Sequence, residues 1–234
     1  MSIRVIAAAV AAATGLAIAS GGPAMAARAS GAARAVQLSG VQLLPALLPA
    51  ADFPAGYAVE KTSVHDSGAR LETAPAKFDL ATMSCGRFAN HFGDQGYGES
   101  AMAHDAIANH GQTKAFLQQV YQFKASKAAT PFFNGLRAIL HRCPDFPFQG
   151  SGSNPGFKLT WKLLTAPAIG GHRTFQFDLT AKPDGVTFAL DLVFTVAGPD
   201  VFFTGTVDAL SAPPASPSPR AIMLKLINRV RALR

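Results

Sequence analysis

The sequence predicts an α+β protein in which helices pack against an antiparallel β-sheet, and three observations point to this fold class. Four successive runs after residue 157 alternate apolar and polar residues, which is the pattern of strands with one buried face. Two earlier stretches and the C-terminal stretch instead repeat apolar residues at the helical period. The chain has only two cysteines, Cys85 and Cys143, and each lies in one of those earlier helical stretches. We therefore predict a sheet covered by helices and fastened by one disulfide.

In chain order, residues 1–26 have the pattern of a secretory signal peptide. Arg4 precedes an apolar run over residues 5–19, and Ala24-Met25-Ala26 forms an A-x-A cleavage site. The run is shorter than the roughly 20 residues that a membrane-spanning helix needs, so an uncleaved anchor is the weaker alternative. We expect cleavage after Ala26 and a secreted, extracellular protein of the cell envelope.

Residues 27–42 are small and polar without a sustained period, and they predict a flexible lead-in to a single domain over residues 43–234. The chain carries 21 Lys and Arg against 14 Asp and Glu, a formal charge of +7. Because the cations are scattered apart from a few at the C-terminus, we expect no nucleic-acid binding. The basic balance suits acidic polymers or lipids of an envelope, and we expect a monomer.

Prolines among apolar residues after position 43 suit a short helix and a docking loop. A strand is predicted over residues 57–64, then a polar loop through residue 76. The next stretch, residues 80–92, predicts a helix with Cys85 on its apolar stripe and Gly93 as its stop.

Residues 99–109 and 114–124 predict a β-hairpin, although the alanine-rich first arm also fits a helix. The following helix is predicted to begin at Thr130 as N-cap with Pro131 at the first helical position. Its apolar face ends in Cys143, and Pro144 stops it.

The four alternating runs, residues 157–163, 175–180, 186–196 and 201–207, are joined by "GG", "PDG" and "GPD" turns. They predict an antiparallel meander with one apolar and one polar face. The polar face is either plain surface or one wall of a ligand cleft. Its candidate ligand-binding residues are Lys158, Lys162, Gln176, Asp178, Asp191 and Thr204.

After a proline-rich linker over residues 211–219, residues 220–234 predict a basic amphipathic helix. Such a helix either docks on its own domain, which the apolar stripe favours, or makes peripheral contact with an anionic membrane.

The two cysteines predict a structural disulfide, because both lie on helix faces expected to be buried and the chain is expected to reach an oxidising compartment. A catalytic thiol paired with His141 would need an exposed thiolate, which a buried helix face does not provide. The six histidines are dispersed, so we expect no metal and no cofactor. We find no phosphate-binding loop, dinucleotide turn or serine-hydrolase elbow.

The order of these elements resembles the PknH-type extracellular sensor domain of mycobacteria and related actinobacteria. The resemblance covers residues 43–234 and rests on "LLPAADFPAGY", the helix with Cys85, "KAFLQQVYQF", the aromatic helix ending in Cys143, the antiparallel strands and the basic terminal helix. It implies an α/β domain with flanking helices, a disulfide matching Cys85 and Cys143, and a cleft for an unidentified ligand. A second cysteine pair of the family is absent here.

The sequence therefore predicts a secreted, non-enzymatic, sensor-like binding domain that captures a small envelope molecule or docks an envelope partner beside the sheet. One alternative is a carrier of apolar or lipid ligands, motivated by 17 phenylalanines. A weaker one is a secreted hydrolase that uses Asp178 and Asp191 as paired carboxylates.

Overall fold

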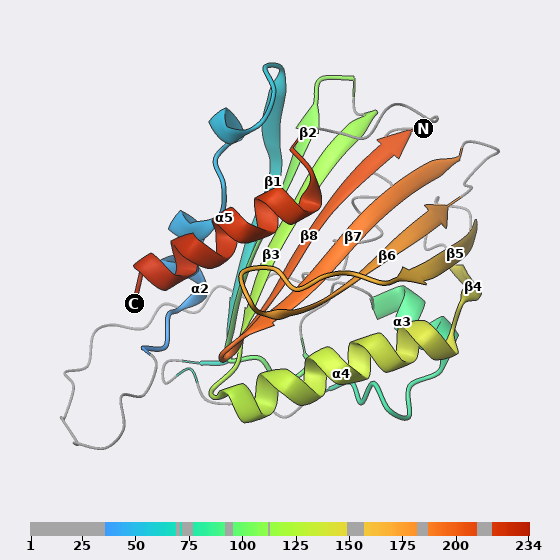
Figure 1. The fold of residues 1–234 in the computed structure, drawn as a ribbon, viewed down its shortest axis with the longest axis horizontal. Coiled ribbons are helices and arrows are strands. Elements are labelled where there is room, and N and C mark those ends of the chain that lie inside the picture. The colour runs from blue at the N-terminus through green and yellow to red at the C-terminus, as the bar shows by residue number, and fades with distance from the viewer. Residues whose placement is uncertain are drawn as a thin grey trace.

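A single antiparallel sheet forms the centre of the structure. The computed structural model describes residues 36–68, 71, 77–91, 96–111, 113–148, 157–181, 187–209 and 217–234. Its strands lie in the order β1-β2-β3-β8-β7-β6-β5-β4 (Figure 1). Their bounds are β1 (Tyr57–Asp66), β2 (Ala101–Asn109), β3 (Lys114–Gln122), β4 (Asp145–Phe148), β5 (Phe157–Leu164), β6 (Arg173–Ala181), β7 (Phe188–Ala197) and β8 (Asp200–Ala209). The predicted α+β fold class is confirmed.

The predicted strands come from two separate parts of the chain, and the pairing of β3 with β8 joins them. The predicted meander is β5 to β8, and the predicted first strand and hairpin are β1 to β3. The alanine-rich first arm of the hairpin is strand β2, so the helical alternative for it is wrong. The short edge strand β4 was not predicted.

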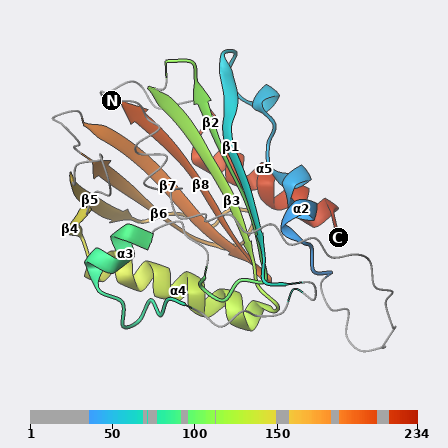
Figure 2. The ribbon, with the colours of Figure 1, turned by 180° about the vertical axis from the view of Figure 1, so that it is seen from behind.

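Helices cover both faces of this sheet. The described helices are α2 (Gly40–Leu43), α3 (Cys85–His91), α4 (Ser126–Arg142) and α5 (Pro219–Ala232), with 3-10 turns η1 (Leu44–Ala46) and η2 (Ala50–Asp52). In Figure 1 α5 crosses in front of the strands, whereas Figure 2 shows it behind them, with α3 and α4 in view. The adjacent residues Phe202 and Phe203 accordingly belong to different apolar clusters, one packed by α5 and one by α4.

Because both faces are covered at the centre of the sheet, all ten residues of β8 are buried. The expected polar face is therefore not continuous. It is covered at β3 and β8, and it is open toward β5 and β6, where Lys162 and Asp178 are exposed.

Helix α4 begins earlier than predicted. Its N-cap is Ala125 rather than Thr130, and Pro131 lies inside the helix. The alanines that precede Thr130 favour the helical state, and Ala129 is fully buried, which extends the helix toward its N-terminus despite the missing proline N–H.

Helix α3 is shorter than predicted and begins at Cys85. Before it, the Asp79 carboxylate accepts hydrogen bonds from the Ala81 N–H at 2.9 Å and the Thr82 hydroxyl at 3.0 Å. This local side-chain turn competes with the helical backbone pattern over residues 80–82. The predicted stop at Gly93 lies outside the described residues.

The predicted flexible lead-in, residues 27–42, extends too far. Ser39 caps α2, and the backbone of Leu38 is held by both ends of the Gln122 amide, at 2.9 and 2.7 Å. Gly40 lies so close to the β1–β2 pair that a Cβ atom there would meet the Met102 carbonyl oxygen at 2.7 Å. Residues 1–35, and with them the predicted signal peptide and its cleavage after Ala26, lie outside the described residues.

The C-terminal helix α5 docks on the sheet. Ser218 caps it, Pro219 is its first residue, and its stripe of apolar side chains is buried against strands β7 and β8. The apolar face that a membrane contact would use is therefore occupied by the protein's own core. Residues 211–216 of the predicted linker lie outside the described residues. Within the described part of the chain, no helix is both long and apolar enough to cross a membrane.

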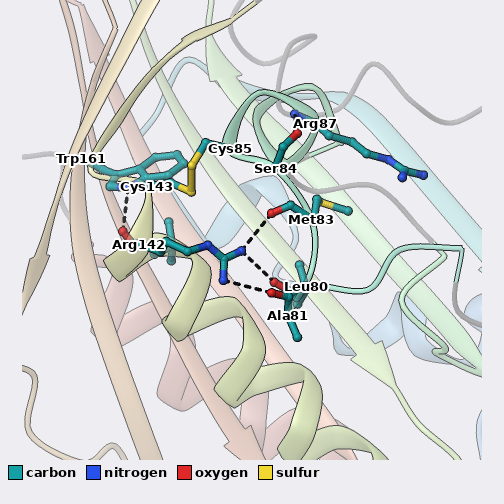
Figure 3. The surroundings of a disulfide bond; sticks show 10 residues. Leu80, Ala81, Met83, Ser84, Cys85, Arg87, Arg142, Cys143 and Trp161 are labelled. Carbon is teal, nitrogen blue, oxygen red and sulfur yellow. Dashed lines mark hydrogen bonds between the residues drawn. A yellow bond between two sulfur atoms is a disulfide. The ribbon is translucent and has the colours of Figure 1, made fainter.

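The predicted disulfide between Cys85 and Cys143 is present, with the two Cα atoms 5.5 Å apart. It joins the first residue of α3 to the residue that ends α4. Beside it, the Arg142 guanidinium donates hydrogen bonds to carbonyls of the 80–83 segment, at 2.9 to 3.3 Å (Figure 3). The indole N–H of Trp161 on β5 donates to the Leu140 carbonyl at 3.0 Å. The disulfide therefore fastens α3 to α4, and the Trp161 hydrogen bond ties β5 to the end of α4.

Candidate functional site

Cross-strand pairing brings most of the predicted ligand-binding residues together on the α5 side of the sheet. Lys162 on β5 lies opposite Asp178 on β6, and Asp178 lies opposite Asp191 on β7. Gln176 is two residues from Asp178, on the same face. Directly opposed residues in an antiparallel pair have Cβ atoms roughly 4.5–5.5 Å apart, so these side chains are immediate neighbours. Lys158 lies on β5, but its side chain is outside the described part of the structure.

Thr204 does not face a ligand. It is fully buried, and its hydroxyl donates a hydrogen bond of 2.8 Å to the carbonyl of Pro219 at the start of α5. The prediction of Thr204 as a ligand-binding residue is corrected accordingly. Its alternating position is right, but α5 covers it, so its contact positions the helix on the sheet.

The start of α5 brings the cation of Arg220 to the same face. The sequence prediction did not include this residue. Arg220 donates from Nη2 to the Pro167 carbonyl at 2.9 Å and to the Ala168 carbonyl at 3.4 Å. Its Nη1 is buried and has no hydrogen-bond partner among the described residues. We call Lys162, Gln176, Asp178, Asp191 and Arg220 the polar strip.

The electrostatics of the polar strip centre on Asp191, which is half-buried. Burial raises the pKa of this carboxyl, and the hydrogen bond from the Gln176 amide, 2.8 Å long, lowers it. The negative charge of Asp178 raises the pKa and the positive charge of Arg220 lowers it. Two carboxylates directly opposite each other repel, and two cations offset this repulsion: Lys162 lies opposite Asp178, and the charge of Arg220 acts on Asp191.

This arrangement is suited to binding a polar molecule. Four of its five residues stand on the neighbouring strands β5, β6 and β7, and Arg220 reaches them from the start of α5, so donors and acceptors lie together on one face. Among the described residues, no group of three His, Cys, Asp or Glu side chains could hold a metal ion.

The phenylalanines lie mostly on the other face, where they pack against each other. Phe175 and Phe194 stack with ring centroids 5.1 Å apart, and Phe133 of α4 approaches Phe175 to 4.9 Å. The aromatic content that motivated an apolar carrier is therefore used in the core beneath α4.

Comparison with solved structures shows what this architecture is similar to. The structure matches the crystal structure of the extracellular domain of PknH from Mycobacterium tuberculosis with a TM-score of 0.58, covering 83% of this chain and 97% of that chain. The chain has the fold of the PknH extracellular domain. The sequence identity is 12%, so the likeness is one of fold.

The comparison confirms, for the fold, the resemblance that the order of the sequence elements predicts. A putative uncharacterized protein from Mycobacterium smegmatis gives a TM-score of 0.39 at 15% identity, covering 77% of this chain and 92% of that one. No protein-family model and no curated protein matches the sequence.

Proposed function

We propose that the protein is a non-enzymatic, extracytoplasmic binding domain of the sensor type, which captures a small polar molecule of the cell envelope, or docks an envelope partner, on the polar strip. The observation that carries this proposal is the shared fold with a domain described as extracellular, the one in PknH. The disulfide supports the same compartment, because such bonds persist mainly in oxidising surroundings.

The composition of the polar strip indicates the kind of molecule. Lys162 and Arg220 supply donors, Asp178 and Asp191 supply acceptors, and Gln176 is held against Asp191. The formal charges of these five residues cancel, which favours a neutral or zwitterionic ligand with several hydrogen-bonding groups. Lys162 and Asp178 are exposed, so a ligand can reach the strip from solvent.

Native mass spectrometry tests this proposal. The full chain would be secreted from a host through its own leader, recovered from the medium, incubated with a small-molecule extract of a bacterial envelope, and measured under native and then denaturing conditions. We expect an added mass under native conditions that is lost on denaturation. A bound lipid released by organic solvent would instead favour the apolar carrier.

Two matched variants locate the bound molecule. Asp178→Ala combined with Asp191→Ala should abolish the added mass, whereas Lys127→Ala combined with Arg137→Ala, two exposed cations of α4, should leave it unchanged. An unliganded native mass in every extract would contradict the proposal. Equal loss of the ligand in both variants would contradict the assigned location.

A further inference from the structure

A second group of polar side chains lies at the β1 end of the sheet, on the face opposite the polar strip. Ser63 on β1, His104 on β2 and Gln119 on β3 are directly opposed across the three strands. The neighbouring residues Met102 and Leu117 belong to the apolar cluster that α4 covers, which places this row on the α4 side. We call Lys61, Ser63, His104 and Gln119 the β1-edge cluster.

The cluster contains buried polar atoms that have no hydrogen-bond partner among the described residues. The His104 side chain is buried, its residue only 4% exposed, and neither ring nitrogen has a hydrogen-bond partner in the described part of the chain. The same holds for the buried hydroxyl of Ser63, on the strand beside it. Unpaired buried donors and acceptors are costly and rare in native proteins, where a bound water, ion or ligand commonly explains them.

The charges near His104 point to the sign of the missing group. Burial, and after it the cation of Lys61 two residues from Ser63 on β1, lowers the pKa of His104 to about 4. The paired residues of strands β1 to β3 that lie on this face include the basic side chains of Lys61, His65 and His104. None of these paired residues on this face is an aspartate or a glutamate. Glu60, which the bulge between Val59 and Lys61 inserts, is exposed.

The cluster also lies close to solvent. Strand β1 is an edge strand, and its residues on this face, Lys61 and Ser63, are half-buried. His104 lies on β2, the strand next to this edge.

We propose that the β1-edge cluster binds a small oxyanion, the carboxylate or phosphate group of a small molecule, with Ser63 and His104 donating hydrogen bonds to its oxygens and Lys61 balancing its charge. Hydroxyl and imidazole donors together with an ammonium group are the chemistry that recognises such oxygens. The Gln119 amide beside them donates a hydrogen bond of 2.7 Å to the Met102 sulfur. This site is separate from the polar strip and does not depend on the function proposed for it.

Histidine ring signals in nuclear magnetic resonance test the proposal on the intact chain. Protein labelled with ¹⁵N-histidine would be titrated with inorganic phosphate, with acetate, and with glycerol as a neutral control, at constant ionic strength in sodium chloride. We expect a saturable shift of the His104 ring nitrogens with phosphate, acetate or both, and none with glycerol. The anion that acts at lower concentration distinguishes a phosphate from a carboxylate ligand.

Three variants test whether the anion binds at the β1-edge cluster: two remove a positive charge, and one replaces His104 with an apolar residue. Lys61→Gln should weaken anion binding about tenfold, which corresponds to about 1.4 kcal/mol, and Lys127→Gln on α4 should not change it. His104→Leu should remove the stabilisation by phosphate in a thermal shift assay. If His104→Leu does not fold, the titration of the unchanged chain and of Lys61→Gln still decides the matter.

A His104 ring that responds to neither anion would overturn the proposal, and a buried water would then be what satisfies His104 and Ser63. An equal response to glycerol would overturn it too. So would equal weakening by the Lys61 and Lys127 substitutions.

Discussion

The two faces of the sheet are held to their helices by different interactions. On the α4 side, the Cys85–Cys143 disulfide and packed aromatic rings fasten α3 and α4. On the α5 side, an apolar cluster holds α5, and glutamine amides and ion pairs add to it without any covalent link. Gln118, for example, bonds both the N–H and the carbonyl of Leu48, each at 2.8 Å.

A buried ion pair holds the C-terminal residue on the α5 side of the sheet. Arg234, the last residue, donates two hydrogen bonds of 2.7 Å to the buried carboxylate of Asp200 and a third, of 3.1 Å, to Gln122. Gln122 also holds Leu38, so the two ends of the described chain meet at one amide. The comparison teaches that the α4 side is fastened covalently, whereas the α5 side, which carries the polar strip, is fastened by apolar packing, amide hydrogen bonds and a buried ion pair.

Removal of the disulfide is expected to have the largest effect on stability. Replacing Cys85 and Cys143 with alanine should lower the free energy of unfolding by about 4 kcal/mol, the chain-entropy value for a loop of 58 residues. Urea unfolding of the variant and of the parent chain measures the difference. Adding reductant should destabilise only the parent, and an unchanged midpoint in the variant would show that the disulfide adds nothing to the scaffold.

On the α5 side, Asp200→Ala should cost about 3 kcal/mol, because it leaves the Arg234 guanidinium without its buried partner. The control is Asp52→Ala, since the ion pairs of Asp52 with Lys225 and Arg229 are largely exposed and should contribute less than about 1 kcal/mol. Thermal unfolding of the two variants compares them. Similar losses would show that burial does not set the strength of these contacts.

Acid should weaken the α4 side through His104. Above pH 6.5 this histidine is neutral in both the folded and the unfolded chain. As the pH falls toward about 4, the unfolded chain takes up the proton first, so about 3 kcal/mol of stability is lost.

Raised pKa values of Asp191 and Asp200, caused chiefly by burial, act in the opposite direction. The effect of His104 is therefore measured as the difference in urea unfolding between the parent chain and His104→Leu at pH 7 and at pH 4. A difference independent of pH would contradict the assignment.

A smaller effect is expected from Gln118→Leu. This change leaves the N–H and the carbonyl of Leu48 buried without partners, and it should cost about 2 kcal/mol. Hydrogen exchange should then speed up at Leu48 and along α5, but not in α4. Uniform acceleration in both helices would show that the two faces do not open independently.

Much of the fold could be predicted, because its strongest patterns are local. The period of two over β5 to β8 and the turn residues between these strands are read directly from neighbouring residues. The disulfide followed from two cysteines on apolar helix faces. The start of α4 could not be read correctly, since Thr130 and Pro131 form a strong local start signal that buried alanines override.

The candidate site was only partly predictable for a different reason. Alternation along each strand placed Gln176, Asp178 and Asp191 on one face, and the pairing register brought them together. Nothing in the pattern of β8 shows that α5 covers Thr204, or that Arg220 arrives beside Asp191. Such contacts join segments that are distant in sequence, and polar residues buried between two layers look the same in sequence as exposed ones.

Hydrogen exchange on the full chain with and without a small-molecule envelope extract tests most directly the claim that the polar strip binds a molecule and that α3 and α4 support the sheet behind it. We predict slower exchange in β5 to β7 and at the start of α5, centred on Gln176, Asp178 and Asp191, with no change in α4. Protection confined to α3 and α4, or no protection in any extract, would contradict the account.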